Sequence, residues 1–192
     1  MSTSADRRYV LADALPAFAV RDAILVVSYA ALVGLLAQVV IPLPFTPVPI
    51  TGQTFGVLLG GMTLGWRRAV AGMALYVGLG LVGLPWFAGG NGGLAVVRAP
   101  SFGYLIGFVV AAAVVGRLAE MRLDRNPLLT LGAMLAGTAI IYLFGVPWLM
   151  VAIHVDVVQG IALGLTPFLL GDAIKALLAA GLLPAGWKAV GR

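Results

Sequence analysis

The chain has 192 residues, of which 61% are hydrophobic and 10% are charged, with a formal net charge of +5. Soluble domains average about 45–50% apolar and about 25% charged residues, so this composition excludes a soluble protein and predicts an integral membrane protein. The chain has no cysteine and a single histidine, His154, which excludes a disulfide framework and leaves no Cys or His cluster for a metal. The basic residues separate apolar runs and form no basic face, so we expect no nucleic-acid partner.

Six apolar segments predict six membrane helices. The first has twenty residues, which at about 1.5 Å each cover the roughly 30 Å hydrocarbon core. We expect Pro147 to break the fifth helix and Pro184 to stop the sixth, with a short interfacial helix and a turn at 147–166. The six predicted spans are 22–41, 52–66, 69–84, 100–116, 127–146 and 167–183.

The distribution of positive charge predicts the orientation. Ten of the twelve basic residues fall in the two terminal segments and in two of the connections, all on one side of a six-span arrangement. The positive-inside rule places that side in the cytoplasm. We therefore expect an all-α bundle of six transmembrane helices that forms one domain, 22–184, and contacts membrane lipid. The segments 1–21 and 185–192 would be cytoplasmic tails.

Small residues on the first span predict a close helix contact. Ala30 and Gly34 lie four residues apart and so share one face. Small residues at that spacing let another helix approach closely.

Two irregular segments lie between the spans. Pro42–Gln53 has four prolines in its first eight residues and cannot be helical. It can form a rigid hairpin that fixes helix order or a pocket wall with Thr46 and Gln53 as polar groups, and we expect a mixture of the two.

The second irregular segment, 83–104, has five glycines between Gly83 and Gly93. Its strong hydrogen-bonding side chains are Asn91 and Arg98. Few polar groups in an apolar, irregular wall are typical of a small-molecule site, although such a loop can also simply join two helices. Its large aromatic residues are Trp86, Phe87, Phe102 and Tyr104.

Asp172 and Lys175 lie three residues apart on one face of the last helix. Charges inside a span are costly and usually functional. The alternative is an ion pair within the helix that tolerates burial and has no further function. Together with Asn91 and Arg98 they suit a compact, partly apolar ligand with an amide-like head and an acid group. No hydrolase motif and no phosphate-binding loop occurs in the sequence, so we expect no catalytic residue and no ATP hydrolysis by this chain.

Three segments together resemble the biotin-specific S components, the BioY family, of energy-coupling factor transporters. They are Pro42–Gln53, then Gly83–Gly93 with Pro100–Gly107, and Pro167–Lys175, and the resemblance extends over 22–184. It implies a prokaryotic cytoplasmic-membrane subunit that captures biotin from the outer side and needs no cofactor. Its partners would be a transmembrane coupling subunit and ABC-type ATPases.

The resemblance also assigns residues. The site residues of the family carry over to Asn91, Arg98, Asp172 and Lys175, and Ala30 and Gly34 stand where the first helix docks on the coupling subunit. The residues leave open which cation meets the acid group of biotin and whether the subunit forms a homo-oligomer. Two other functions remain alternatives: a solitary proton-coupled carrier of a small organic acid with Asp172 as proton site, and an intramembrane enzyme with Asp172 as base.

Overall fold

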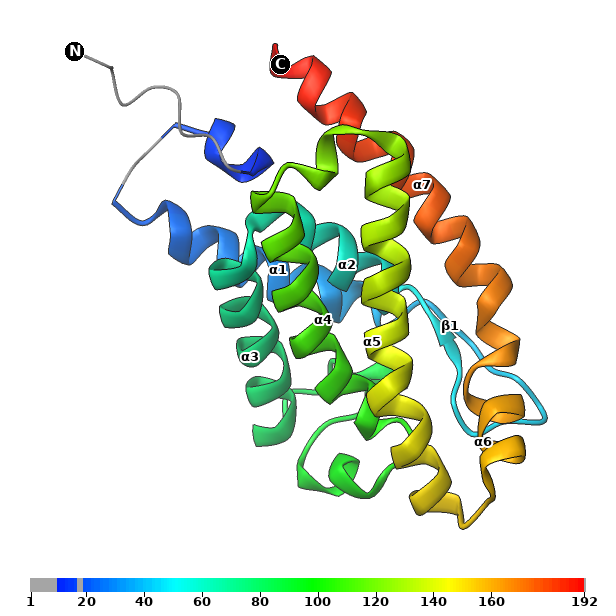
Figure 1. Ribbon diagram of the computed structural model, residues 1–192. Helices are drawn as coiled ribbons and strands as arrows, with labels where there is room; N and C mark the ends of the chain where they lie inside the picture. Colours follow the sequence, from blue (N-terminus) through cyan, green and yellow to red (C-terminus); the bar gives the residue numbers. More distant parts are fainter. Residues whose placement is uncertain (1–9, 17–18, 192) are drawn as a thin grey trace.

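The computed structural model describes residues 10–16 and 19–191, which are mostly helical (Figure 1). The α-helices are α1 Arg21–Leu36, α2 Gln53–Leu64, α3 Trp66–Val82, α4 Phe102–Glu120, α5 Pro127–Ile153, α6 Val157–Gly164 and α7 Leu169–Ala189. Short 3-10 helices lie at η2 Leu11–Ala14, η3 Ala88–Gly90, η4 Leu94–Arg98, η5 Leu123–Arg125 and η6 Thr166–Phe168. Helices α1 to α5 and α7 correspond to the six predicted spans, and α6 is the predicted short helix.

Helix α4 forms the centre of the bundle, packed against α2, α3 and α5, while α7 runs along α5 (Figure 1). Glycine is what lets α4 and α5 meet. A Cβ on Gly107 would lie 2.9 Å from the Cα of Ile141, closer than real Cβ atoms come to backbone. This close packing fixes the positions of the side chains that α4 and α5 direct toward the same cavity.

A short hairpin connects α1 and α2. Strand β1, Val40–Ile41, pairs antiparallel with β2, Ile50–Thr51, so the proline-rich residues between them form the hairpin loop. The hairpin predicted for this segment is therefore present, and its residues Val48, Pro49 and Thr51 also line the cavity described below. The Thr46 hydroxyl donates to the carbonyl of Leu163 in α6 at 2.9 Å, which ties the loop to the other end of the chain.

The two prolines that were expected to end helices lie inside them, so both predictions were wrong. Helix α5 continues through Pro147 to Ile153, and α7 continues through Pro184 to Ala189. A proline removes one helical hydrogen bond, but tertiary contacts hold both segments helical. Trp148 Nε1 donates to the carbonyl of Ala99 at 3.1 Å, and Trp187 is 1% exposed.

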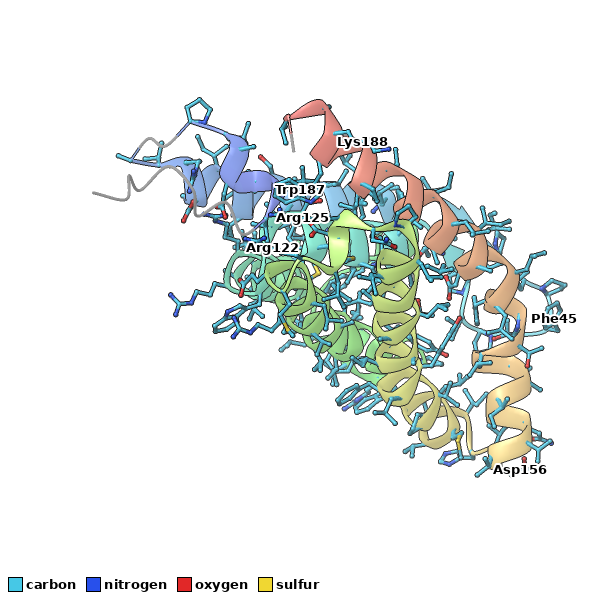
Figure 2. The ribbon with its side chains drawn as sticks, turned by 45° about the horizontal axis from the view of Figure 1, so that its top comes forward. Phe45, Arg122, Arg125, Asp156, Trp187 and Lys188 are labelled. Carbon is cyan, nitrogen blue, oxygen red and sulfur yellow. The ribbon has the colours of Figure 1, made fainter. Side chains whose placement is uncertain are left out.

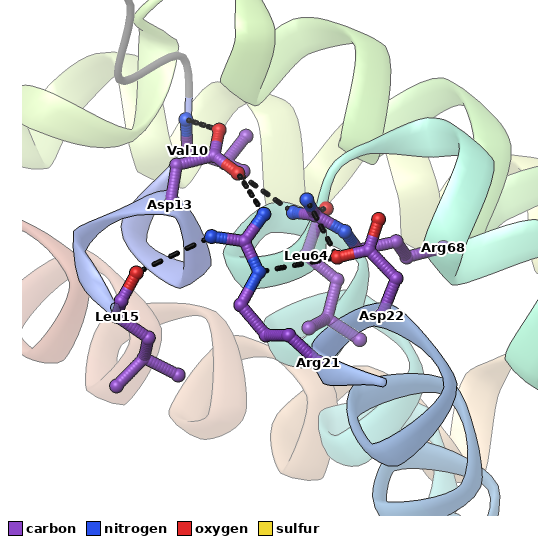
Figure 3. A network of polar contacts seen from close by, with 7 residues as sticks. All are labelled: Val10, Asp13, Leu15, Arg21, Asp22, Leu64 and Arg68. Carbon is purple, nitrogen blue, oxygen red and sulfur yellow. Dashed lines mark hydrogen bonds and ion pairs between the residues drawn. The ribbon is translucent and has the colours of Figure 1, made fainter. Parts of the chain in front are cut away.

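Charged residues gather at one end of the bundle, which we call the basic end. Arg122, Arg125 and Lys188 lie there, and Asp156 lies at the opposite end (Figure 2). An ion-pair network joins η2 and the start of α1 to the start of α3 (Figure 3). The network contains three close ion pairs, with these nitrogen–oxygen distances: Arg68 with Asp13 at 2.8 Å, Arg68 with Asp22 at 3.0 Å, and Arg21 with Asp22 at 3.2 Å. With Val10 and Ala12 buried, this part of the predicted tail packs against the bundle.

Three stretches of the described chain are long and apolar enough to cross a membrane, namely Phe102–Glu120, Pro127–Ile153 and Val157–Ala189. Helices α1, α2 and α3 have 16, 12 and 17 residues. They are shorter than the roughly 20 residues of a typical spanning helix, and they pack against one another and against the long α4.

Candidate functional site

A cavity of about 310 Å³ lies among the hairpin, the start of α2, the loop before α4, and helices α4, α5 and α7. Most of its wall is apolar, contributed by residues such as Val48, Phe87, Val96, Phe108 and Phe168. An enclosed apolar space with a few convergent polar groups is the usual form of a small-molecule site. The polar lining residues are Thr51, Gln53, Thr54, Asn91, Ser101, Tyr104, Tyr142, Asp172 and Lys175.

Asp172 and Lys175 form an ion pair on the cavity wall, one turn apart on α7. Lys175 Nζ lies 3.0 Å from Asp172 Oδ1, 2.6 Å from Thr54 Oγ1 and 3.0 Å from the carbonyl of Thr51. An ammonium group has three donors, so its donors are all taken within the protein. Because an unpaired buried charge is expensive, this cage explains how Lys175 is accommodated.

Asp172 keeps capacity to accept further hydrogen bonds. Its Oδ1 accepts from Lys175 and from Thr54 Oγ1 at 3.3 Å, and its Oδ2 accepts from the hydroxyl of Tyr142. Two carboxylate oxygens offer about four lone-pair sites, and three are used by these donors. Asp172 is 7% exposed and borders the cavity, so the remaining acceptor site of its carboxylate is available to a donor on a ligand.

Tyr142 and Thr54 are site residues that sequence reasoning missed. Tyr142 comes from the middle of α5 and Thr54 from the first turn of α2, and both contact Asp172. The only signal for Tyr142 was that it is the one tyrosine of an apolar helix, and such tyrosines are common in helix cores. Thr54 stood one residue after the predicted Gln53 and carried no separate signal.

Gln53 lines the cavity and begins a buried hydrogen-bond chain. Its Nε2 donates to the hydroxyl of Tyr76 at 2.8 Å, and its Oε1 accepts from Thr51 Oγ1 at 3.1 Å. Trp86 Nε1 donates to the carbonyl of Tyr76 at 3.0 Å. In the turn after α1, Gln38 Nε2 donates to the carbonyl of Trp86 at 3.0 Å and to that of Gly34 in α1 at 2.9 Å. The chain fastens the glycine-rich loop to α1, α2 and α3 and orients the amide of Gln53.

The glycine-rich loop presents Asn91 at the cavity through a tight turn. Gly89 and Gly90 have φ values of 72° and 73°, which residues with a Cβ rarely adopt. The amide N–H of Phe87 donates to the carbonyl of Asn91 at 3.0 Å, and Asn91 Nδ2 donates to the carbonyl of Ala88 at 2.7 Å. The side-chain oxygen of Asn91 is therefore directed by its own turn, and the conformation needs glycine at both positions.

Two predicted aromatic residues form part of the wall. Phe87 is 3% exposed, and its ring meets that of Tyr76 edge-on at 5.3 Å. The Tyr104 hydroxyl donates to the carbonyl of Gly164 at 2.6 Å, which anchors this lining residue to the end of α6. The structure thus brings together Gln53, Phe87, Asn91, Tyr104, Asp172 and Lys175.

Three other predicted residues lie outside the wall. Trp86 packs behind it against Tyr76, with ring centroids 5.1 Å apart, and Thr46 is bonded to α6. Arg98 is exposed at the end of η4, between the lining residues Val96 and Ala99. It forms no ion pair with any residue that the structure describes.

Ala30 and Gly34 face the interior, which corrects the prediction that they form an accessible docking face. Ala30 is 1% exposed, and a Cβ on Gly34 would lie 2.9 Å from the indole of Trp86. The predicted contact was with another helix, whereas the close neighbour of Gly34 is Trp86 of the chain's own glycine-rich loop. The exposed residues of α1 are instead the set Asp22, Ala23, Ile24, Val27, Ser28, Ala31, Leu32 and Leu35.

Comparisons with known proteins agree with this architecture. The profile of the BioY family matches residues 6–192. The biotin transporter BioY of Rhizobium etli is 35% identical over 170 residues, covering 83% of this chain and 89% of that protein. The biotin transporter BioY of Thermotoga maritima is 41% identical over 140 residues, covering 73% of this chain and 81% of that protein.

One solved structure is also similar. The crystal structure of the S-component for biotin from an ECF-type ABC transporter superposes with a TM-score of 0.80 and 28% identity, covering 88% of this chain and 92% of that one. The shared helical architecture identifies an integral, multi-pass membrane protein. The profile match over nearly the whole chain, the curated relatives and the shared structure lead to one conclusion: this chain belongs to the BioY family.

Proposed function

We propose that this protein is the biotin-capturing S component of an energy-coupling factor importer in a prokaryotic cytoplasmic membrane. It is a transport protein and not an enzyme, as its family indicates. The observation that carries the proposal is the buried carboxylate of Asp172, which borders an apolar cavity of about 310 Å³ and retains capacity to accept hydrogen bonds. Biotin has a ureido ring with two N–H donors beside an apolar thioether ring.

The hydrogen bonds of Lys175 suggest how biotin is oriented. Because Thr51, Thr54 and Asp172 already occupy its three donors, Lys175 acts mainly to hold the carboxylate of Asp172 in place. Asp172 then accepts a ureido N–H as a charge-assisted hydrogen bond, and the amide of Asn91 complements the ureido carbonyl or its second N–H. The ureido ring therefore binds at the α7 side of the cavity.

The valerate acid of biotin requires a cation elsewhere. Arg98 is exposed beside the cavity wall and has no ion-pair partner among the described residues. A guanidinium group binds a carboxylate with two parallel hydrogen bonds. Arg98 therefore meets the acid at the edge of the cavity, while Lys175 does not.

The orientation in the membrane follows from the distribution of charge. The basic end, with Arg122, Arg125 and Lys188 (Figure 2), faces the cytoplasm under the positive-inside rule. The six longer helices then cross the bilayer with both termini in the cytoplasm, and the cavity opens toward the outer side. Captured biotin must therefore be released across the bundle by a partner.

Energy comes from partner subunits. This chain contains no phosphate-binding loop, so ATP hydrolysis is supplied by ABC-type ATPases through a transmembrane coupling subunit. With Ala30 and Gly34 buried, the docking face of α1 is its outward stripe of Ala23, Val27 and Ala31, spaced by four residues and exposed. Small residues there let a partner helix approach closely.

Calorimetry of the purified protein tests the proposed ligand. Biotin and desthiobiotin, which share the ureido ring and the acid, should both bind, whereas thiamine, a cation without either group, should not. Thiamine binding, or no heat with biotin, would contradict the proposal. Uptake into proteoliposomes distinguishes the solitary carrier: transport by this chain alone under a proton gradient would favour that alternative.

A further inference from the structure

The start of α3 and the end of α4 border a second, open groove of about 530 Å³. Trp66, Arg67, Ala113, Val114 and Arg117 line it, far along α4 from the ligand cavity. Gly116 sets its geometry, because a Cβ there would lie 2.6 Å from the backbone nitrogen of Trp66. This contact between α3 and α4 holds Arg67 and Arg117 on opposite sides of one groove.

The two arginines have donors to offer. Arg68, the neighbour of Arg67, forms ion pairs with Asp13 and Asp22 (Figure 3). Arg67 has no ion pair within the part of the chain that the structure describes. The Arg67 guanidinium lies 5.4 Å from the ring centroid of Trp66. Arg117 uses only Nη1, at 2.7 Å from Glu120, and its side chain is 66% exposed, so this pair contributes little.

The groove is basic at one end and apolar at the other. Ala113 lies one helical turn before Arg117 on α4, and Val114 lies next to it, so the apolar part points toward the middle of the bundle. Trp66 is 38% exposed, and tryptophan is enriched at the membrane–water interface.

From this arrangement we infer that the groove binds the phosphate headgroup of an anionic glycerophospholipid of the cytoplasmic leaflet. Arg67 and Arg117 hold the phosphate, and Ala113 and Val114 contact the start of the acyl chains. Basic pockets between helices on the cytoplasmic side have this chemistry, and each basic residue near an anionic surface contributes about fivefold in affinity. This site is separate from ligand capture and concerns how the subunit sits in its membrane.

Native mass spectrometry of the detergent-purified protein tests the inference, with phosphatidylglycerol and phosphatidylcholine as probes. The parent should retain phosphatidylglycerol in preference, and the double variant Arg67→Gln/Arg117→Gln should bind it at least about tenfold more weakly. Arg122→Gln is the matched control, because Arg122 is exposed at the same end but does not line the groove. It should keep the preference, and all variants should bind biotin like the parent.

Other results would overturn the inference. Equal retention of the two lipids by the parent would mean that the groove does not recognise an anionic headgroup. An equal loss in Arg122→Gln would mean that only general surface charge is involved. Competition by soluble glycerol phosphate as strong as that by the lipid would mean that the groove takes a free anion. If the double variant keeps its lipid preference but no longer assembles with the coupling subunit, the groove is a protein contact.

Discussion

The ammonium group of Lys175 lies 3.0 Å from the carboxylate of Asp172 on the wall of the cavity. The pair is buried, with side-chain exposures of 19% and 8%, and further donors from α2 and α5 complete it. Breaking such a pair on one side leaves an uncompensated charge. Under the proposed function, Lys175 therefore supports Asp172, and Asp172 is the group that would face the ligand.

Tyr142→Phe should weaken biotin binding by about three- to tenfold. The substitution removes the hydroxyl that donates to Asp172 Oδ2 and keeps the ring that lines the cavity. A hydrogen bond to a charged group contributes roughly 1.5–3 kcal/mol. Part of this energy should be lost from the binding free energy of biotin, because the carboxylate is then less well oriented. Isothermal titration measures the affinity, and unchanged binding would show that the other partners of Asp172 suffice to orient it.

Arg98→Gln should reduce affinity for biotin but leave affinity for biotin amide unchanged. The amide retains the ureido ring and lacks the negative charge, so it tests the acid end alone. Because Lys175 has no free donor, this lining cation cannot bind the acid group in place of Arg98. An equal loss of affinity for both ligands would indicate that Arg98 acts on the loop and not on the acid.

Gly34→Leu should lower the melting temperature, whereas Ala31→Leu should not. A side chain at Gly34 meets the indole of Trp86, and overpacking costs about 1–3 kcal/mol. For a chain of this size each kcal/mol corresponds to roughly 2–4 °C. Ala31 is exposed on the same helix, so its substitution should instead impair assembly with the coupling subunit.

A stable Gly34→Leu variant that fails only in assembly would restore the original assignment of that face. Ala31→Leu with full assembly would show that docking uses another surface. Thermal melting and co-purification with the coupling subunit read the two properties separately.

Trp187→Phe should destabilise the protein more at neutral pH than in acid. Asp124 in η5 is fully buried and accepts from Trp187 Nε1 at 2.5 Å. Burial raises the pKa of Asp124 above its usual value, and the Trp187 hydrogen bond opposes that rise. A carboxyl with a raised pKa stabilises the fold below its unfolded pKa and loses that contribution as the pH rises through the folded pKa.

Without the indole donor, more folding stability is lost as the pH rises through the folded pKa of Asp124, because the ionised carboxylate then has one hydrogen-bond partner fewer. We expect the variant to be less stable by about 1–3 kcal/mol at pH 7, with a smaller difference near pH 4. Melting curves of parent and variant across this range test it. A difference that does not change with pH would assign the effect to lost packing of the ring.

The sequence predicted the central part of the site because charges are conspicuous in an apolar chain. Asp172 and Lys175 stood one turn apart in a span, and Asn91 stood among glycines that required a turn. Tyr142 was not predictable, since it meets Asp172 from a helix 30 residues away and a lone tyrosine in an apolar helix is ordinary core. Its role depends on the packing of α5 against α7.

The direction of a helix face was the other feature that sequence reasoning could not supply. The spacing of Ala30 and Gly34 predicts a close helix contact, but Gly34 packs against Trp86 of the loop. Because α1 is apolar around much of its surface, the spacing does not distinguish inside from outside. Likewise Pro147 and Pro184 read as helix ends by rules from soluble proteins. Neighbouring helices hold both segments helical here, as they commonly do in membrane proteins.

The most direct test of the account compares Asp172→Asn with Asp156→Asn by calorimetric titration with biotin. Asp156 is the matched control, because it is exposed, lies outside the cavity and caps α6 through Gln159 N at 2.9 Å, a role that Asn also fills. Asp172→Asn loses the charge that strengthens a ureido hydrogen bond. Melting curves verify that each variant is folded, since Asp172→Asn also leaves Lys175 one charged partner fewer.

The account predicts that Asp172→Asn binds biotin at least about tenfold more weakly, because roughly 1.4 kcal/mol is one decade of affinity, while Asp156→Asn binds like the parent. A folded Asp172→Asn variant with parental affinity would contradict the account, and loss of binding in Asp156→Asn would place the site on the other acidic residue.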